Sequence, residues 1–578
     1  MKKHFIIATA LLGAGIAAQA ANVDVTSDIA TSTTWTKDNV YNLTKQIYVR
    51  AGATLTIQEG TLVQSTTGVG GSLAVSRGAK IYVNGTKDDP VIMTSTSDTL
   101  TEWHEGCNEW GNLTLMGRGL IGASSDSVRD RGTNTKTPTG LNVVQMEGLT
   151  DDSVNDTYYG GNDDNDDSGS ISYLSLRYGG KVVGLANELN GLSLGAIGRE
   201  TDIHHVEIMN NVDDGIEIWG GTVNLKYLNI WNVGDDSLDI DQGYRGKIQF
   251  GLIVQGYSTD GSQGSGLGDN CIEIDGAEDS DAQPVTTTKI ANFTVIGNYL
   301  SGDGATTWRD NARVQYHNCI FADIGEEAVR YDNTDGDGAQ GYGYNGTLSW
   351  ADTWTTAYTN YSAVNWVSDI YADQADCYPV QTSGYLAEMK GCLFNYCNES
   401  DSGDQILALG IVNGSAGAWE SNPALDNIVT TADPIVGFER GPTVTRGGKS
   451  VALVTNINPC AQNEALSVAN PEASDGFFVN APFRGAFSSS YNWLAGWTSV
   501  DQYGMTETGM NGAAPGASIA SGVVVSFPSE FGVEYEIQGA DSADGDWSYV
   551  ASVVGDGSYI QYGDADLQAS GFYRVVVK

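Results

Sequence analysis

Positively charged side chains are scarce in this sequence. Only 29 of its 578 residues are Lys or Arg, against 72 Asp and Glu, so the formal net charge is −43 at pH 7. A chain this acidic repels nucleic acids and anionic membranes, which excludes both as partners. It also repels acidic polysaccharides unless a divalent cation such as Ca²⁺ bridges the two. The hydrophobic content of 40% still predicts a folded protein.

Long hydrophobic runs are also missing, apart from one near the N-terminus. Residues 6–17 are apolar, follow Lys2 and Lys3, and precede the small residues around Gln19. Such a run is too short to span a bilayer, and the pattern is typical of a secretory signal peptide over residues 1–20. We therefore predict export to the extracellular medium or cell surface, with the periplasm as the alternative, and no membrane span. Removing the signal lowers the net charge to −45.

The sequence also lacks the apolar periodicity of helices. No segment repeats its apolar residues every 3.6 positions, whereas short strands with alternating apolar residues are separated by glycine turns. Three early strands carry apolar pairs at one constant interval, which predicts that each interval is one coil: Leu55 and Ile57, Leu73 and Val75, Val91 and Met93. Parallel strands without crossover helices indicate a β-solenoid.

Four acidic turns are the most informative pattern that is present. They occupy residues 212–218 (VDDGIEI), 234–240 (GDDSLDI), 268–274 (GDNCIEI) and 325–331 (GEEAVRY). Each turn bears two acidic or amide side chains and leads into an alternating strand. The first two begin at positions 212 and 234, and this separation is typical of one solenoid coil. We therefore expect the acidic side chains to stack along one edge of a rod.

The seven cysteines form no zinc-site spacing, and their odd number leaves at least one thiol free unless a partner supplies another. Cys271 and Cys319 fall at strand positions and are expected to be buried rather than bonded. Near the C-terminus, residues 511–520 are small and flexible and predict a linker. Four strands with Gly and Asp turns follow, which predicts a small antiparallel β-module over residues 521–578.

Several motifs resemble a known family. These are the runs at residues 188–195, 213–215 and 219–224, the stretch 235–243, and the closing segments 483–487 and 493–498. They are similar to secreted right-handed parallel β-helix proteins of Gram-negative bacteria, with a pectin-lyase-like fold, over residues 40–501. The resemblance implies an all-β fold, a right-handed parallel β-helix over residues 21–510, and export. It implies no particular activity, because these proteins generally carry no established one.

The acidic turns also invite comparison with polygalacturonases, which share the pectin-lyase-like fold and carry two acidic turns one coil apart. On that hypothesis the catalytic carboxyls are Asp213, Asp214, Asp235, Asp236 and Asp269, one acting as acid and another activating water. The sequence lacks the Gly-His-Gly turn and the Arg-Ile-Lys triplet of that family. The competing interpretation is structural: Asp and Asn side chains accept hydrogen bonds from backbone N–H groups of the turns.

A polysaccharide lyase would need a basic residue to abstract a proton, and usually Ca²⁺ to neutralise the uronate. Arg245 and Lys247 follow the second acidic turn and are the nearest candidates. The simpler explanation is that both side chains are exposed to solvent at the rim of the turn and have no catalytic role.

Calcium is the ligand that the sequence favours. Asn333, Asp335 and Asp337 match the first half of a calcium loop, but position 344 is Tyr rather than the Glu of an EF-hand. A second acidic cluster contains three further oxygen ligands: Asp163, Asp164 and Asp166. The alternative for both segments is an acidic loop that binds no metal ion.

His204 and His205 are adjacent in a strand and are therefore predicted to point to opposite faces, which disfavours a metal pair or a catalytic dyad.

Two functions follow from the sequence. The first is a secreted or cell-surface β-helix that is adhesive, glycan-binding or structural. The second is an extracellular polysaccharide hydrolase or lyase that uses the acidic edge. The partner in either case is a polysaccharide or cell-surface glycan, and self-assembly stays open.

Overall fold

The computed structural model describes most of the chain between residues 21 and 577. The described ranges are 21–123, 143–149, 156–184, 187–258, 268–277, 283–300, 302, 304–331, 348–359, 371, 373–398, 405–406, 423–446, 448–507, 524–528, 533–540, 547–554, 559–563 and 572–577. The predicted signal peptide, the predicted linker, and Asn333, Asp335 and Asp337 lie outside these residues.

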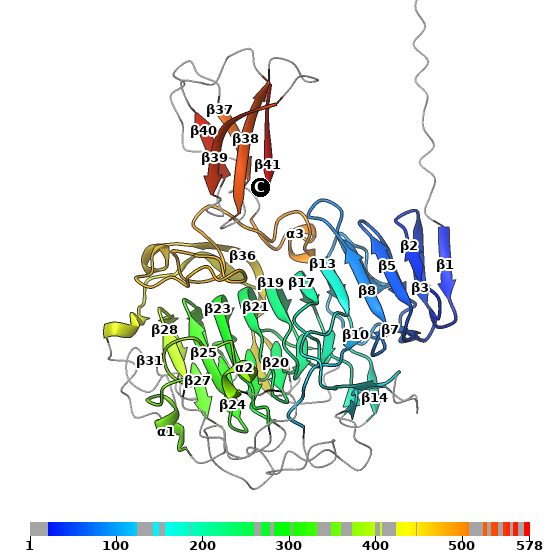
Figure 1. Ribbon diagram of the computed structural model, residues 1–578, viewed down its shortest axis with the longest axis horizontal. Coiled ribbons are helices and arrows are strands. Elements are labelled where there is room, and N and C mark those ends of the chain that lie inside the picture. Colours follow the sequence, from blue (N-terminus) through cyan, green and yellow to red (C-terminus); the bar gives the residue numbers. More distant parts are fainter. Residues whose placement is uncertain are drawn as a thin grey trace, which may run out of the picture.

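Two parallel sheets wind around one core, and their strands stack side by side from β1 at one end to β28 near the other (Figure 1). The longer sheet contains β1 (Ala21–Val25), β2 (Thr33–Trp35), β3 (Asn39–Leu43), β5 (Thr54–Gln58), β6 (Leu62–Ser65), β8 (Lys80–Asn84), β9 (Val91–Ser95), β13 (Gly169–Arg177), β17 (Asp202–Met209), β19 (Asn224–Trp231), β21 (Lys247–Val254), β23 (Thr287–Ile296), β25 (Arg313–His317), β26 (Ile320–Ala322), β28 (Glu388–Lys390), β29 (Leu393–Asn395) and β32 (Ile428–Val429). The shorter sheet contains β4 (Gln46–Val49), β7 (Ser72–Val75), β10 (Leu113–Met116), β16 (Leu192–Gly195), β18 (Ile216–Trp219), β20 (Leu238–Asp241), β22 (Ile272–Asp275), β24 (Thr306–Arg309) and β27 (Val329–Tyr331). This parallel β-helix confirms the predicted architecture.

The coil length is confirmed for the acidic turns and is wrong for the first coils. Ile216 pairs with Leu238, so the second acidic turn lies one coil after the first, as predicted. In the first coils Leu55 pairs with Ile81 rather than stacking on Leu73. Leu73 belongs to the other sheet, where it pairs with Leu113. The interval from Leu55 to Leu73 therefore runs from one face to another, because alternation alone does not say which face a strand joins.

The longer sheet bends into two faces along a row of left-handed residues. The first half of β13 pairs with β8 and its second half with β9, and between them Tyr173 has a φ of 47°. The same conformation recurs in the next coils at His205, Tyr227 and Phe250. Because the side chains before and after the bend resume strand alternation, apolar residues of both halves enter one core.

Inside the helix, aliphatic side chains stack in rows, as in Ile216, Leu238 and Ile272. The residue just before each of these is small, for a steric reason. A Cβ on Gly215 would lie against the carbonyl oxygen of Ser237 and 2.6 Å from Ile230 Cγ2. Packing at the first acidic turn thus requires glycine at position 215.

Outside the two parallel sheets, the chain forms antiparallel strand pairs and short helices. They are β11 (Val144–Gln145) with β12 (Tyr158–Tyr159), β14 (Val182–Gly184) with β15 (Asn187–Glu188), β30 (Cys397–Asn398) with β31 (Gln405–Ile406), β33 (Ile435–Arg440) with β36 (Val454–Ala461), β34 (Val444–Arg446) with β35 (Lys449–Val451), α1 (Trp350–Thr353), α2 (Gln374–Cys377), α3 (Ser499–Gln502), and the 3₁₀ turns Pro423–Leu425 and Asn463–Leu466. Within the described residues no helix is long and apolar enough to cross a membrane.

The C-terminal strands are antiparallel, as predicted. They are β37 (Val524–Pro528) with β40 (Tyr559–Gly563), and β38 (Glu534–Ala540) between β39 (Ser548–Val554) and β41 (Phe572–Val577). The sequence identified four of these strands and missed β40. Phe527, Tyr535 and Ile537 form their small core. All seven cysteines lie in the described part of the chain, where they are buried free thiols, which confirms the expectation for Cys271 and Cys319.

Candidate functional site

The outward side of the shorter sheet carries carboxylates on three consecutive coils. In β18 the side chains of Ile216 and Ile218 enter the core, so Glu217 between them points outward. The strand register places Glu217 beside Asp239 of β20, and Asp239 beside Glu273 of β22. Alternation in each strand and the parallel register between strands therefore build a row of acids.

A second acidic row lies in the turns that precede these strands, and its members bind the backbone of the neighbouring coil. The side-chain oxygen of Asn190 accepts a hydrogen bond from the N–H of Asp214 at 3.2 Å. Asp214 Oδ1 in turn accepts from the N–H of Asp236 at 2.9 Å, and Asp236 Oδ1 accepts from the N–H of Asn270 at 2.7 Å. The structural interpretation of the acidic turns thus holds for Asp214 and Asp236, with each bond joining consecutive coils.

Asp213 and Asp235 complete the acidic face, which we define as Asp213, Asp214, Glu217, Asp235, Asp236, Asp239 and Glu273. Two triads within it have one oxygen from each member within 4.8 Å of the others: Asp213, Asp214 and Asp235, and Asp214, Glu217 and Asp239. Asp214 belongs to both triads. Asp213, Asp214 and Glu217 are each at most 8% exposed, and Asp239 Oδ1 is buried without a hydrogen-bond partner.

Burial and mutual repulsion make these carboxyls hard to ionise. Burial, and then the charge of Asp235, raises the pKa of Asp213 to about 8. Burial and Asp269 raise the pKa of Asp235 to about 7. Burial raises the pKa of Asp239 to about 6, against the opposing charge of Arg309. The pKa values of Asp214, Glu217 and Asp236 lie well above the usual range for the same reasons.

Two groups beside the acidic face were not singled out by the sequence. Arg309, at the end of β24, forms ion pairs with Glu273 and with Asp275, the latter at 2.9 Å from Nε to Oδ1. Glu147, from a segment outside the two sheets, has its pKa raised to about 7 by burial and by Glu188. Strand alternation after each acidic turn was the signal for Glu217, Asp239 and Glu273, whereas nothing local places Glu147 or Arg309 there.

Arg245 and Lys247 do not join the acidic face. Arg245 is 1% exposed, and its guanidinium holds Asp164 through two bonds of 2.6 and 2.9 Å. Lys247 begins β21 in the longer sheet and forms an ion pair with Asp475. The proton-abstracting pair expected for a lyase is therefore not assembled with the predicted carboxyls. Asp269 does lie beside the acidic face, because its backbone N–H donates to the Asp235 carbonyl at 3.0 Å.

The acidic cluster predicted to bind calcium is divided by its contacts. Both oxygens of Asp164 are used, Oδ1 by the Leu120 N–H at 2.9 Å and by Arg245, Oδ2 by Arg245 and the Tyr371 hydroxyl. Asp166 accepts from the Ser168 hydroxyl at 2.8 Å, while Asp163 is exposed. Asp164 therefore serves as the counterion of Arg245.

The prediction for the adjacent histidines is wrong. His204 Nδ1 and His205 Nδ1 are 2.8 Å apart, so the two rings meet instead of pointing to opposite faces. The cause is the left-handed backbone of His205, whose φ of 54° interrupts strand alternation at the bend between the two faces.

Comparison with known proteins gives one match. A family model described as a pectate-lyase-like beta helix domain covers residues 27–366, which include the whole acidic face. No curated protein matches the chain. No solved structure matches it either.

Proposed function

Because the chain belongs to the pectate-lyase-like β-helix family, we propose that it is an exported, non-catalytic protein that binds an acidic polysaccharide through its acidic face, with Ca²⁺ as the bridge. The observation that carries this proposal is the pair of carboxylate triads that share Asp214. Adhesion to a cell-surface glycan, or a structural role in an extracellular matrix, would follow from such binding.

The residues of the acidic face fit calcium. Ca²⁺ takes oxygen ligands at about 2.3–2.6 Å, so two of its ligands lie at most about 5.2 Å apart. The oxygens of each triad lie within 4.8 Å of one another. Asp214, Glu217 and Asp239 would hold the ion, and the buried, unpartnered Oδ1 of Asp239 supports this assignment. When bound, Ca²⁺ would neutralise these carboxylates and attract the carboxylate of a uronic sugar.

Two features support binding rather than catalysis. Asp214 and Asp236 each have an oxygen committed to a backbone N–H of the next coil, which is a structural duty. The basic residues Arg245 and Lys247 have partners elsewhere, Asp164 and Asp475. A polyanion would also be repelled by a chain of net charge −43 without a bridging cation.

A polysaccharide hydrolase is the second candidate, and one observation favours it. The pKa of Asp213 is raised to about 8 and that of Asp239 to about 6, so near pH 7 the first is protonated and the second ionised. A glycosidase needs one carboxyl in each state, the protonated one as general acid and the ionised one as base or nucleophile.

The deciding experiment measures binding and turnover on the same samples. The mature protein would be incubated with polygalacturonate, alginate and neutral glycans, in Ca²⁺ or in EGTA. Sedimentation would report binding, and new reducing ends or ultraviolet-absorbing unsaturated products would report turnover. The test variant is Asp235→Asn/Asp239→Asn, and the control is Asp38→Asn, an exposed acid in the first coil.

We expect Ca²⁺-dependent binding of acidic glycans without turnover, lost in the double variant and kept in Asp38→Asn. Turnover that disappears in the double variant would establish the hydrolase or lyase instead. Binding that is equal in EGTA and in Ca²⁺ would refute the calcium bridge.

A further inference from the structure

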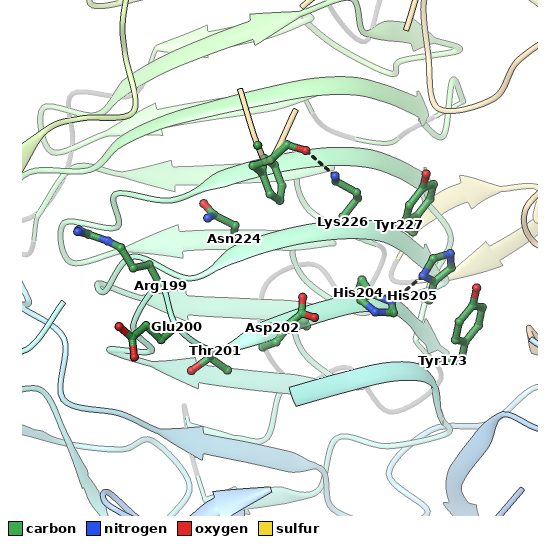
Figure 2. Close-up of a pocket in the computed structure, with 13 residues that line it drawn as sticks. Tyr173, Arg199, Glu200, Thr201, Asp202, His204, His205, Asn224, Lys226 and Tyr227 are labelled. Atoms are coloured by element: carbon green, nitrogen blue, oxygen red, sulfur yellow. Dashed lines mark hydrogen bonds between the residues drawn. The ribbon is translucent and has the colours of Figure 1, made fainter. Parts of the chain in front are cut away.

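A cavity of about 630 Å³ lies on the outward side of the longer sheet, over β17 and β19 (Figure 2). It is separate from the acidic face, which lies on strands of the shorter sheet and on the turns before them. Its size is within the range of about 300–1,000 Å³ that is usual for small-ligand sites. None of the carboxyls proposed to bind polysaccharide lines it, so a function of this cavity is independent of the acidic face.

Polar side chains from two coils form the floor of the cavity. In the strand register Asp202 of β17 lies beside Asn224 of β19, and His204 lies beside Lys226. Asn224 Oδ1 accepts the backbone N–H of Lys247 at 2.9 Å, which fixes the amide and leaves its nitrogen as a donor. Figure 2 shows Arg199, from the turn before β17, at the end of the floor far from the aromatic rings. The floor therefore presents hydrogen-bond donors and acceptors, and it carries side chains of both charge signs.

Aromatic rings form one end wall, which we call the aromatic corner: Tyr173, His205 and Tyr227. His205 stacks on both tyrosines, with ring centroids 4.1 Å and 4.3 Å away. Trp497, from outside the cavity lining, meets the Tyr173 ring edge-on with centroids 5.7 Å apart. The bend in each coil positions these rings, so the wall is rigid before any ligand arrives.

A strap, residues 471–478, adds Gly476 and Phe477 to the cavity lining and contacts lysines of three coils. Lys226 Nζ donates to the carbonyl of Phe477 at 2.5 Å and lies 4.5 Å from the centre of its ring. In the next coils Lys247 pairs with Asp475, and Lys289 pairs with Glu472 at 3.3 Å. The strap carboxylates neutralise Lys247 and Lys289. The two cations of the lining, Arg199 and Lys226, are matched in number by Glu200 and Asp202, so a polyanion gains little here.

We propose that this cavity binds a pyranose residue of a neutral glycan chain, without a metal ion. Fixed donors and acceptors beside a rigid aromatic wall are what sugar recognition requires, since hydroxyl groups both donate and accept while C–H edges pack on rings. Asp202 accepts hydroxyl hydrogens, and Asn224 and Arg199 donate to hydroxyl oxygens. The protein would then hold two glycans, an acidic one through Ca²⁺ on the shorter sheet and a neutral one on the longer sheet.

Calorimetry with neutral hexasaccharides (cello-, xylo-, manno- and galacto-series) and with galacturonan and alginate hexasaccharides tests this proposal in EGTA. The variant is Arg199→Ala/Asp202→Ala, because both side chains are exposed and their loss leaves the core intact. Asp38→Ala/Lys45→Ala, also exposed, is the matched control for charge and truncation. Far-ultraviolet circular dichroism checks that each variant is folded.

We expect at least one neutral hexasaccharide to bind in EGTA, with affinity about tenfold or more weaker in Arg199→Ala/Asp202→Ala and unchanged in the control. The acidic-face variant Asp235→Asn/Asp239→Asn should retain this binding, so failure of one site is distinguishable from failure of the other. The proposal is overturned if no neutral hexasaccharide binds, if the cavity variant binds as well as the control, or if only the acidic hexasaccharides bind.

Discussion

The substitution Asp235→Asn is expected to make this protein more stable, with a larger gain at pH 8 than at pH 5. Asp235 lies in the turn before β20, where burial and Asp269 raise its pKa to about 7. Its folded pKa therefore exceeds the unfolded value of about 3.9. A carboxyl of this kind stabilises the fold while it is protonated, and that stability is lost as the pH rises through the folded pKa.

The magnitude follows from the part of the shift that lies above pH 5. Between pH 5 and the folded pKa of about 7, the folded state retains a proton that the unfolded state has released, at about 1.4 kcal/mol per pH unit, or about 3 kcal/mol in all. With an unfolding entropy of about 2.1 cal/mol/K per residue, a solenoid of this length changes by about 1 kcal/mol per kelvin. The wild type should therefore lose about 3 °C in Tm from Asp235 alone.

Thermal unfolding followed by circular dichroism at pH 5 and pH 8, in EGTA and in Ca²⁺, measures this effect. Asp38→Asn removes the same charge far from the acidic face and separates local repulsion from that of the whole chain. Ca²⁺ at about 100 times its Kd should restore about 2.7 kcal/mol to the wild type at pH 8. Equal Tm losses in Asp235→Asn and Asp38→Asn between the two pH values would refute the reasoning.

Three further predictions concern the coils. Asp236→Ala should destabilise by about 1–3 kcal/mol, because the N–H of Asn270 loses its acceptor at 2.7 Å, whereas Asp236→Asn keeps an oxygen there; chemical denaturation of the pair compares them. Gly215→Val should lower Tm by overpacking the turn, at about 1–3 kcal/mol or more, and an unchanged melting curve would contradict the steric argument. Arg245→Ala should cost about 3–5 kcal/mol by leaving Asp164 buried and unpaired, and Arg245→Met/Asp164→Leu should recover most of this in the same melting assay.

The repeat explains why the fold was predictable. The acidic turns are spaced by one coil, and each ends in a small residue before an apolar one, as in Gly215-Ile216. Such a pattern is local to each coil, and stacking of similar coils makes the rest of the architecture. The first coils were misjudged for the same reason, since Leu55 and Leu73 alternate alike but belong to different sheets.

The candidate site was only partly visible. Asp213, Asp214, Asp235 and Asp236 come together as the repeat predicted, and Asp269 lies beside them. The sequence did not predict that Arg245 lies away from these carboxyls, because its partner Asp164 is distant in the chain. Nor did it predict the contact between the rings of His204 and His205, because this contact depends on the φ angle of His205 at a bend.

The sequence by itself determined the parallel β-helix, the stacking of acidic turns and the antiparallel C-terminal strands, since each depends on alternation and spacing within neighbouring segments. Tertiary structure alone decided which carboxyls are structural and which are available. Asp236 is committed to a backbone N–H, whereas Asp239 keeps a buried oxygen without a partner. Tertiary structure also formed the cavity over β17 and β19, because one wall comes from the sheet and the other from a strap much later in the chain, where Phe477 meets Lys226. Contacts over such distances arise from packing, which no local pattern encodes.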